Sequence, residues 1–261
     1  MRRKKTPEST ITVEEKHYAK PEPLQQAPQP APSPQPAPSG LSTGYGDLDR
    51  LLGGGLPRGY AVLLLSPRCD ERDLLLGKII GSALSAATPA VFLSNDLSKI
   101  RNMAVTYGEN FYALTPQAAK ISAPPANLYE VPVIDSLSDL DVAFKKILGT
   151  RVKQGTGNRL LIVDLLTYSR IFLVDKGGTA KTWFSDFLAT RKAEGFTVLG
   201  FLNPLAASNK ETQTLIEVFD GVIEIYEKEH EGTLRRFLVI KRMHGHRYSD
   251  SELMLDKGKL F

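Results

Sequence analysis

Four short, almost continuous apolar segments set the strongest constraint on the fold. They read YAVLLLS (residues 60–66), AVFLS (90–94), RLLIVD (159–164) and FTVLGFL (196–202). Strands buried on both faces of a parallel sheet have this composition, whereas strands with one solvated face alternate apolar and polar residues. Between them, apolar residues recur at helical spacing in three sets: Leu75, Ile79, Ala83, Ala86; Leu140, Ala143, Phe144, Ile147, Leu148; and Trp183, Phe184, Phe187, Leu188. The alternation predicts an α/β fold with a mostly parallel central sheet flanked by helices.

The C-terminal part breaks this alternation. The segments GVIEIYEKE (221–229) and RRFLVIKRM (235–243) flank the residues HEGTL, which favours an antiparallel hairpin. The last segment, ELMLDKGKLF (252–261), predicts a final strand or two. We therefore expect antiparallel strands at the C-terminal end of the sheet.

Residues 1–40 differ from the rest in composition. They hold nine of the 17 prolines and end in PEPLQQAPQPAPSPQPAPSG. Proline fixes φ and removes a backbone donor, and the segment has too few apolar side chains to offset the entropy of ordering. The sequence predicts a disordered, extended tail over 1–40 and a single domain over 41–261. Its basic start, Arg2 to Lys5, is compatible with a solvated end or with contact to an acidic partner or membrane face.

Bulk composition excludes several classes of protein. A single cysteine rules out an internal disulfide and a cysteine cluster for zinc, and it fits a reducing compartment. No apolar run approaches the ~20 residues that a membrane helix needs, so we expect no transmembrane segment. The start MRRKK is followed by polar residues, unlike a secretory signal. We expect a cytoplasmic protein, and its net charge of +4 barely favours a nucleic-acid partner.

At both ends of the predicted domain, the sequence resembles the KaiC-like branch of the RecA superfamily of P-loop ATPases. The stretch LSTGYGDLDRLLGGGLPRGYAVLLLS (41–66) is similar to that branch's opening: a Ser-Thr-Gly turn, a short Leu-Asp-x-Leu-Leu helix, a glycine turn and the first core strand. FDGVIEIYE and RRFLVIKRMHG are similar to its two C-terminal strands. The resemblance implies a RecA-like three-layer fold, assembly into a ring or filament, and ATP with magnesium held between neighbouring subunits.

A phosphate loop of the form G-x-x-x-x-G-K-[ST] belongs after the first core strand. Its glycines let backbone N–H groups converge on an anion, its lysine reaches the β- and γ-phosphates, and its hydroxyl binds Mg²⁺. In this chain the eight positions are Ser66, Pro67, Arg68, Cys69, Asp70, Glu71, Arg72 and Asp73. Only the positive charge at Arg72 survives, so the resemblance implies a degenerate Walker A loop.

Three carboxylates, on Asp70, Glu71 and Asp73, replace the loop's phosphate-binding groups. Two like charges about 4 Å apart at an effective dielectric near 20 repel by about 4 kcal/mol, and each 1.4 kcal/mol is about tenfold in affinity. The favoured interpretation is a self-capped helix start, with Asp70 as the N-cap and Asp73 in the first turn. The alternative is a remodelled nucleotide site that uses Arg68 and Arg72. We expect Cys69 to be an inert thiol, because the surrounding acids oppose a low thiol pKa.

Two further acids fall on catalytic positions of the family. Asp164 ends RLLIVD and matches the metal-orienting (Walker B) aspartate, but an aspartate at a strand end is also common for structural reasons. The family's water-activating glutamate pair follows the second core strand, where this chain has Asn95, Asp96 and Leu97. Asp96 would be one methylene short as a general base, and the alternative is that it N-caps the next helix.

The resemblance also implies a role for the last core strand at a subunit interface. In the family its Lys-Met-Arg-Gly end reaches a neighbour's phosphate; Arg242 and His244 fall on the lysine and the arginine. The alternative is a basic, exposed strand edge that discourages aggregation. The basic cluster could also contact DNA phosphates, although it has few interleaved aromatic side chains; its members are Arg235, Arg236, Lys241, Arg242 and Arg247.

Three functional hypotheses follow. The first is a regulatory or assembly subunit that has lost ATP hydrolysis and associates with itself or with an ATP-competent relative. The second is an ATP-binding enzyme or switch with an altered loop. The third is a recombination-mediator-like DNA-binding protein. The fold does not choose between them, because function depends on the site.

Overall fold

The computed structural model describes residues 40–131, 142, 144–147, 149, 158–168 and 179–260. The chain divides into two units, Met1–Gln35 and Pro36–Phe261, and the described residues all belong to the second. The predicted tail over 1–40 lies outside the described residues except for Gly40, as do Leu140, Ala143 and Leu148 of one predicted helix. The tail and the domain boundary therefore stay predictions.

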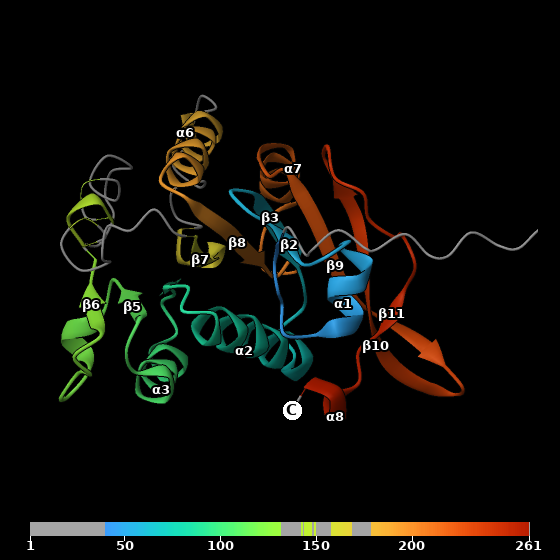
Figure 1. Ribbon diagram of the computed structural model, residues 1–261, viewed down its shortest axis with the longest axis horizontal. Coiled ribbons are helices and arrows are strands. Elements are labelled where there is room, and N and C mark those ends of the chain that lie inside the picture. The colour runs from blue at the N-terminus through green and yellow to red at the C-terminus, as the bar shows by residue number, and fades with distance from the viewer. Residues whose placement is uncertain are drawn as a thin grey trace, which may run out of the picture. The chain divides into compact units, whose positions relative to one another are not determined.

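Within the described residues, nine strands form one sheet in the order β11-β10-β9-β3-β8-β7-β4-β5-β6 (Figure 1). All neighbours from β9 to β6 pair in parallel, and β10 pairs antiparallel with both β9 and β11. The strands are β3 (Ala61–Leu65), β4 (Ala90–Leu93), β5 (Phe111–Thr115), β6 (Leu128–Glu130), β7 (Arg159–Asp164), β8 (Phe196–Leu202), β9 (Gly221–His230), β10 (Thr233–Met243) and β11 (Leu253–Met254).

The predicted α/β sheet is confirmed, with differences at its edges. The four apolar segments are β3, β4, β7 and β8, which lie among the parallel strands of the sheet. Two strands that the apolar segments do not predict, β5 and β6, extend the sheet beyond β4. The C-terminal hairpin is confirmed, but its turn is only Glu231 and Gly232, both with positive φ, as a two-residue turn between twisted strands requires. The final segment forms one strand, β11, and then a helix rather than a second strand.

Helices cover both faces of this sheet (Figure 1). On one face, apolar side chains of α1, α2, α3 and α8 join the core, whereas α6, α7 and Phe144 pack on the other face. The α-helices named here are α1 (Gly46–Leu51), α2 (Asp70–Ser85), α3 (Leu97–Tyr107), α6 (Thr179–Ala193), α7 (Asn209–Val218) and α8 (Lys257–Leu260).

The opening motif has a structural role. The Asp49 carboxylate in α1 accepts hydrogen bonds from the Thr43 N–H at 2.8 Å, the Thr43 hydroxyl at 2.6 Å and the Ser42 hydroxyl at 2.6 Å. The strands β1 (Gly40–Leu41) and β2 (Leu56–Pro57) pair beside it, and a Cβ at Gly55 would lie 2.5 Å from the Leu41 carbonyl oxygen. The motif therefore fixes the chain that leads into β3.

Two glycine substitutions test the packing of this domain. A Cβ at Gly200 in β8 would lie 2.6 Å from Phe219 Cζ, so Gly200→Ala is expected to lower the free energy of unfolding by about 1–3 kcal/mol through overpacking. Gly81 in α2 has open space around it, so Gly81→Ala is expected to raise the same free energy by up to about 1 kcal/mol. Urea unfolding of both variants is the measurement, and equal effects of the two would contradict the packing described.

Candidate functional site

The candidate site lies where the parallel strands end. The carboxyl ends of β3, β4, β7 and β8 share one edge of the sheet, and α2 and α3 begin there. This topology brings residues 66–73, Asp96 and Asp164 to the same edge. Open α/β sheets commonly bind ligands outside this edge.

The connection from β3 to α2 is short and extended. The buried Ser66 donates its N–H to the Leu202 carbonyl at 2.9 Å and its hydroxyl to the Pro67 carbonyl at 2.8 Å. None of the residues 66–73 has a positive φ, and Cys69 is extended (φ −151°, ψ 159°). The prediction that Asp70 is the N-cap is wrong: Cys69 occupies that position, its side chain accepts no capping hydrogen bond, and Asp70 is the first helical residue.

Two acids in the first turn of α2, Asp70 and Glu71, lie near one lysine of the C-terminal segment. Lys257 Nζ in α8 lies 2.7 Å from Asp70 Oδ2 and 3.7 Å from Glu71 Oε1. The Lys257 hydrogen bond lowers the pKa of the Asp70 carboxyl below its ordinary value. These acids therefore bind a lysine side chain rather than capping the helix N–H groups.

The third acid, Asp73, binds cations from two helices. Its Oδ1 atom accepts hydrogen bonds from Arg72 Nε at 3.0 Å and from Lys99 Nζ, in α3, at 2.6 Å. Arg72 is buried, and its guanidinium lies 5.4 Å from the centre of the Phe201 ring. Lys99 Nζ also lies 5.4 Å from that ring centre. The cation that survives from the loop motif thus belongs to an internal network.

Asp164 and Asp96 are joined through Ser94, at the end of β4. The Ser94 hydroxyl donates to Asp164 Oδ2 at 3.0 Å and accepts the Asp96 N–H at 3.1 Å. Asp96 Oδ1 accepts the Lys99 N–H at 3.1 Å, which confirms that Asp96 N-caps α3. Its other oxygen, Oδ2, lies 3.1 Å from the Arg68 guanidinium. The structure therefore brings Asp96, Asp164 and Arg68 together, with Asp96 already in structural use.

Asp164 is a half-buried acid at the end of β7. Burial raises the pKa of its carboxyl above the ordinary value of 3.8, while hydrogen bonds from Ser94 and the Leu166 N–H and the charges of Lys99 and Arg72 oppose that rise. A carboxyl in this setting is a candidate functional group, although structural networks perturb the pKa in the same way.

Arg242 and His244 lie at the opposite edge of the sheet. Gly221, at the start of β9, pairs with Val62 of β3 on one side and with Met243 of β10 on the other. The end of β10 therefore lies at the same edge of the sheet as the beginning of β3. The Arg242 guanidinium donates to the carbonyl oxygens of Ile216 and Phe219, the latter at 2.9 Å. His244 is exposed. The two residues are therefore remote from residues 66–73 of the same chain.

Part of the basic cluster on β10 is neutralised locally. Arg236 lies 2.8 Å from Glu227, and Lys241 lies 2.9 Å from Glu224. With Arg242 bound to carbonyl groups, three of the five cations of the cluster have partners within the chain.

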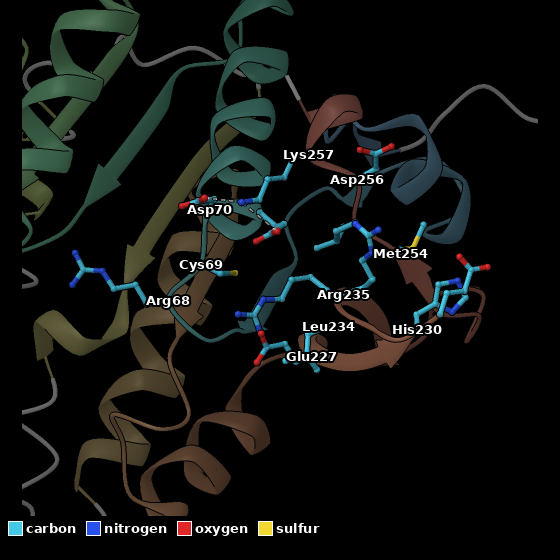
Figure 2. A pocket seen from close by; sticks show the side chains of 14 residues that line it. Arg68, Cys69, Asp70, Glu227, His230, Leu234, Arg235, Met254, Asp256 and Lys257 are labelled. Atoms are coloured by element: carbon cyan, nitrogen blue, oxygen red, sulfur yellow. Dashed lines mark hydrogen bonds and ion pairs between the residues drawn. The ribbon is translucent and has the colours of Figure 1, made fainter.

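A pocket of about 830 Å³ opens beside the start of α2 (Figure 2). Side chains from the α2 start, the β9–β10 hairpin and the β11–α8 segment line it. Figure 2 shows Lys257 reaching Asp70 at its rim, while Arg68 points away from the pocket. Five carboxylates and four cations line it: Asp70, Glu71, Glu227, Glu231, Asp256, Arg68, Arg235, Arg236 and Lys257.

Two lysines of the site, Lys99 and Lys257, are missing from the sequence analysis. Lys99 follows Asp96 by three residues in SNDLSK, so a helix starting at the N-cap places it in the first turn. That spacing was a usable signal. Lys257 gives no such signal, because 187 positions separate it from Asp70.

Comparison with known proteins shows the fold. No family model matches the chain, and no curated protein sequence matches it. Its structure is similar to that of the KaiC-like protein PH0186 from Pyrococcus horikoshii OT3, with a TM-score of 0.59, 16% identity, and coverage of 84% of this chain and 95% of that one. It is also similar to the flagellar accessory protein FlaH from Methanocaldococcus jannaschii, with a TM-score of 0.52, 15% identity, and coverage of 80% and 89%. The predicted KaiC-like, RecA-type fold is confirmed.

The described part of the chain offers neither a membrane-spanning helix nor a metal-binding cluster. Among the described residues, no helix has the length and apolar content needed to cross a membrane. In the same part of the chain, no group of three or more His, Cys, Asp or Glu side chains is arranged to hold a metal ion.

The pKa of Asp164 generates a prediction about pH. Because its pKa is raised in the folded state, the Asp164 carboxyl keeps its proton to a higher pH in the native state than in the unfolded state, where the pKa is 3.8. This group therefore makes the free energy of unfolding fall as the pH rises from 3.8 through the raised pKa. Asp164→Asn keeps the size of the side chain and removes the titration. We expect the variant to gain stability relative to wild type on going from pH 3.5 to pH 7, by urea unfolding at both values. A stability difference that is independent of pH would contradict the raised pKa.

Proposed function

We propose that this chain is a KaiC-like, RecA-fold protein that has lost ATP hydrolysis and acts as a regulatory or assembly subunit. The observation that carries the proposal is the state of residues 66–73. The groups that would face phosphates in an ATPase instead face partners from the same chain: Arg68 binds Asp96, Asp70 binds Lys257, and Arg72 binds Asp73.

The residues present do not fit a magnesium–nucleotide complex. Backbone N–H groups cradle phosphates where the chain curls into a concave nest, which commonly uses residues of positive φ, and residues 66–73 have none. The position of the Mg²⁺-binding hydroxyl is Asp73, whose Oδ1 is already bound to Lys99 and Arg72. Asp164, which matches the family's metal-orienting aspartate, hydrogen-bonds to Ser94 and the Leu166 N–H.

The partner is the less specific part of the proposal. One of the two similar structures is called a flagellar accessory protein, and we carry over such an accessory role to this chain as part of the proposal. Arg242 and His244 lie at the edge of the sheet remote from the loop, which supports a role toward another subunit rather than toward this one. Against that role, the Arg242 guanidinium is bound to two carbonyl oxygens and would have to leave them. We propose a homo-oligomer or a complex with an ATP-competent relative, in the cytoplasm.

One observation favours a second candidate, an ATP-binding switch. Arg72, Lys99 and Asp164 are grouped at the edge where a nucleotide would bind, and the charges of the two cations act on Asp164. If nucleotide displaced Asp73, these groups would be positioned to receive it. No comparable observation favours DNA binding, because the strand cations Arg236 and Lys241 have acidic partners.

Calorimetric titration of MgATP into the full chain tests the proposal. We expect no binding at nucleotide concentrations up to about 1 mM, where a site with only about 4 kcal/mol of binding free energy would be half saturated, because the donors that would bind a phosphate are already bound to Asp73 Oδ1. We also expect no ATP hydrolysis and no change in molar mass, by light scattering, on adding MgATP. Binding that Asp164→Asn weakens, or hydrolysis that it abolishes, would overturn the proposal and establish the ATP-binding alternative.

A further inference from the structure

One oxygen atom of Asp73 accepts hydrogen bonds from both of its cation partners. Asp73 Oδ1 lies 3.0 Å from Arg72 Nε, 2.9 Å from a terminal Arg72 nitrogen and 2.6 Å from Lys99 Nζ. An ordinary surface ion pair holds one such contact. Two charge-assisted hydrogen bonds from cations of two helices converge on this oxygen, which is how proteins bind an oxyanion.

The two cations are held in place independently of Asp73. Arg72 is 8% exposed and Lys99 is 16% exposed, so neither side chain is free to swing into solvent. Both stack on the Phe201 ring, and Lys99 also approaches the Phe92 ring at 5.9 Å from its centre. Contact with aromatic rings stabilises a partly desolvated cation by about 0.5–2 kcal/mol. The donors would therefore keep their places if the carboxylate were removed.

We propose that Arg72 and Lys99 form an oxyanion seat of the phosphate class, and that the Asp73 carboxylate fills it as an internal pseudo-ligand. Asp73 is 42% exposed, so the seat faces solvent on the side from which the carboxylate enters. The inference rests on the proposed function, because it names the side chain that keeps a phosphate group out of this edge. Lys99 comes from α3, and its role in the seat does not follow from the loop motif.

The charge balance supports a seat that needs an anion. Two cations, Arg72 and Lys99, face two carboxylates, Asp73 and Asp164. Removal of Asp73 leaves one desolvated cation without compensation, which is costly in a part-buried setting. A phosphate oxygen would accept hydrogen bonds from the same two cations, so the structure predicts that an emptied seat binds free phosphate.

The test is phosphate binding by the full chain with and without the carboxylate. Asp73→Ala is expected to bind inorganic phosphate at least about tenfold more tightly than wild type, by calorimetric titration and by ³¹P NMR. The matched control is Asp70→Ala, which removes an acid from the same helical turn, changes the net charge equally and lies outside the seat. We expect Asp70→Ala to behave as wild type, and Lys99→Met in the Asp73→Ala background to abolish the gain.

Equal phosphate binding by Asp73→Ala and Asp70→Ala would overturn the proposal, and so would a gain that survives Lys99→Met. If Asp73→Ala folds poorly, Asp73→Asn serves instead, because it keeps the volume and removes the charge. Phosphate is then expected to raise its Tm more than that of wild type, and an equal shift would again overturn the seat.

A parallel titration with MgATP separates this inference from the proposed function. Binding of MgATP by wild type would refute the loss of nucleotide binding, while the comparison of Asp73→Ala with Asp70→Ala would still decide whether the seat exists. Binding of inorganic phosphate but not MgATP by Asp73→Ala would support a seat that receives a small anion. Binding of both would extend it to the phosphoryl group of a nucleotide.

Discussion

The parallel sheet imposes the constraint on which the site depends. Strands buried on both faces can satisfy their backbone groups only by pairing with one another, and parallel pairing puts all their carboxyl ends at one edge. In this chain β3, β4, β7 and β8 end there, so Ser66, Ser94, Asp164 and Phe201 meet although they are far apart in sequence. Polar groups brought to such an edge must find partners, because buried polar groups without hydrogen bonds are costly. Ser94 illustrates the result, since it joins Asp164 to the start of α3.

The charged side chains of residues 68–73 find most of their partners outside this connection between β3 and α2. The partners come from three directions: Asp96 and Lys99 from α3, Lys257 from α8, and Arg72 from α2 itself. The two pairs with α3 have opposite polarity, because the loop supplies the cation in Arg68–Asp96 and the acid in Asp73–Lys99. Opposite polarity favours one alignment of α3 with residues 68–73, since a shifted alignment would bring like charges together. The exposed pair Lys257–Asp70 contributes little energy by comparison.

Much of the fold could be predicted because its signals are local. The four central strands are apolar throughout, and the hairpin is marked by Glu231 and Gly232 between alternating segments. In contrast, β6 has three residues, LYE, and offers no pattern that distinguishes it from a loop. Within the site, Asp96 was recognisable as an N-cap, whereas the N-cap of α2 was misplaced by one residue because acids at N-terminal positions suit either the cap or the first turn. The pairing of Asp73 with Lys99 depends on helix orientation across the sheet edge, which no sequence spacing encodes.

The cation partners of the three acids change which physical cause keeps a phosphate group away from residues 66–73. From sequence alone, the acids at 70, 71 and 73 oppose phosphate by repulsion, as if each charge stood without a partner. The structure gives each of them a cation, so the net field at the edge is far weaker than that argument assumed. What opposes a phosphate group under the proposed function is then occupancy: donors that would bind it are already bound to Asp73 Oδ1. Repulsion from three acids would persist after any single substitution, whereas occupancy by one carboxylate ends when that carboxylate is removed. Repulsion therefore predicts similar effects on phosphate binding for substitutions at Asp70 and Asp73, whereas occupancy predicts an effect at Asp73 alone.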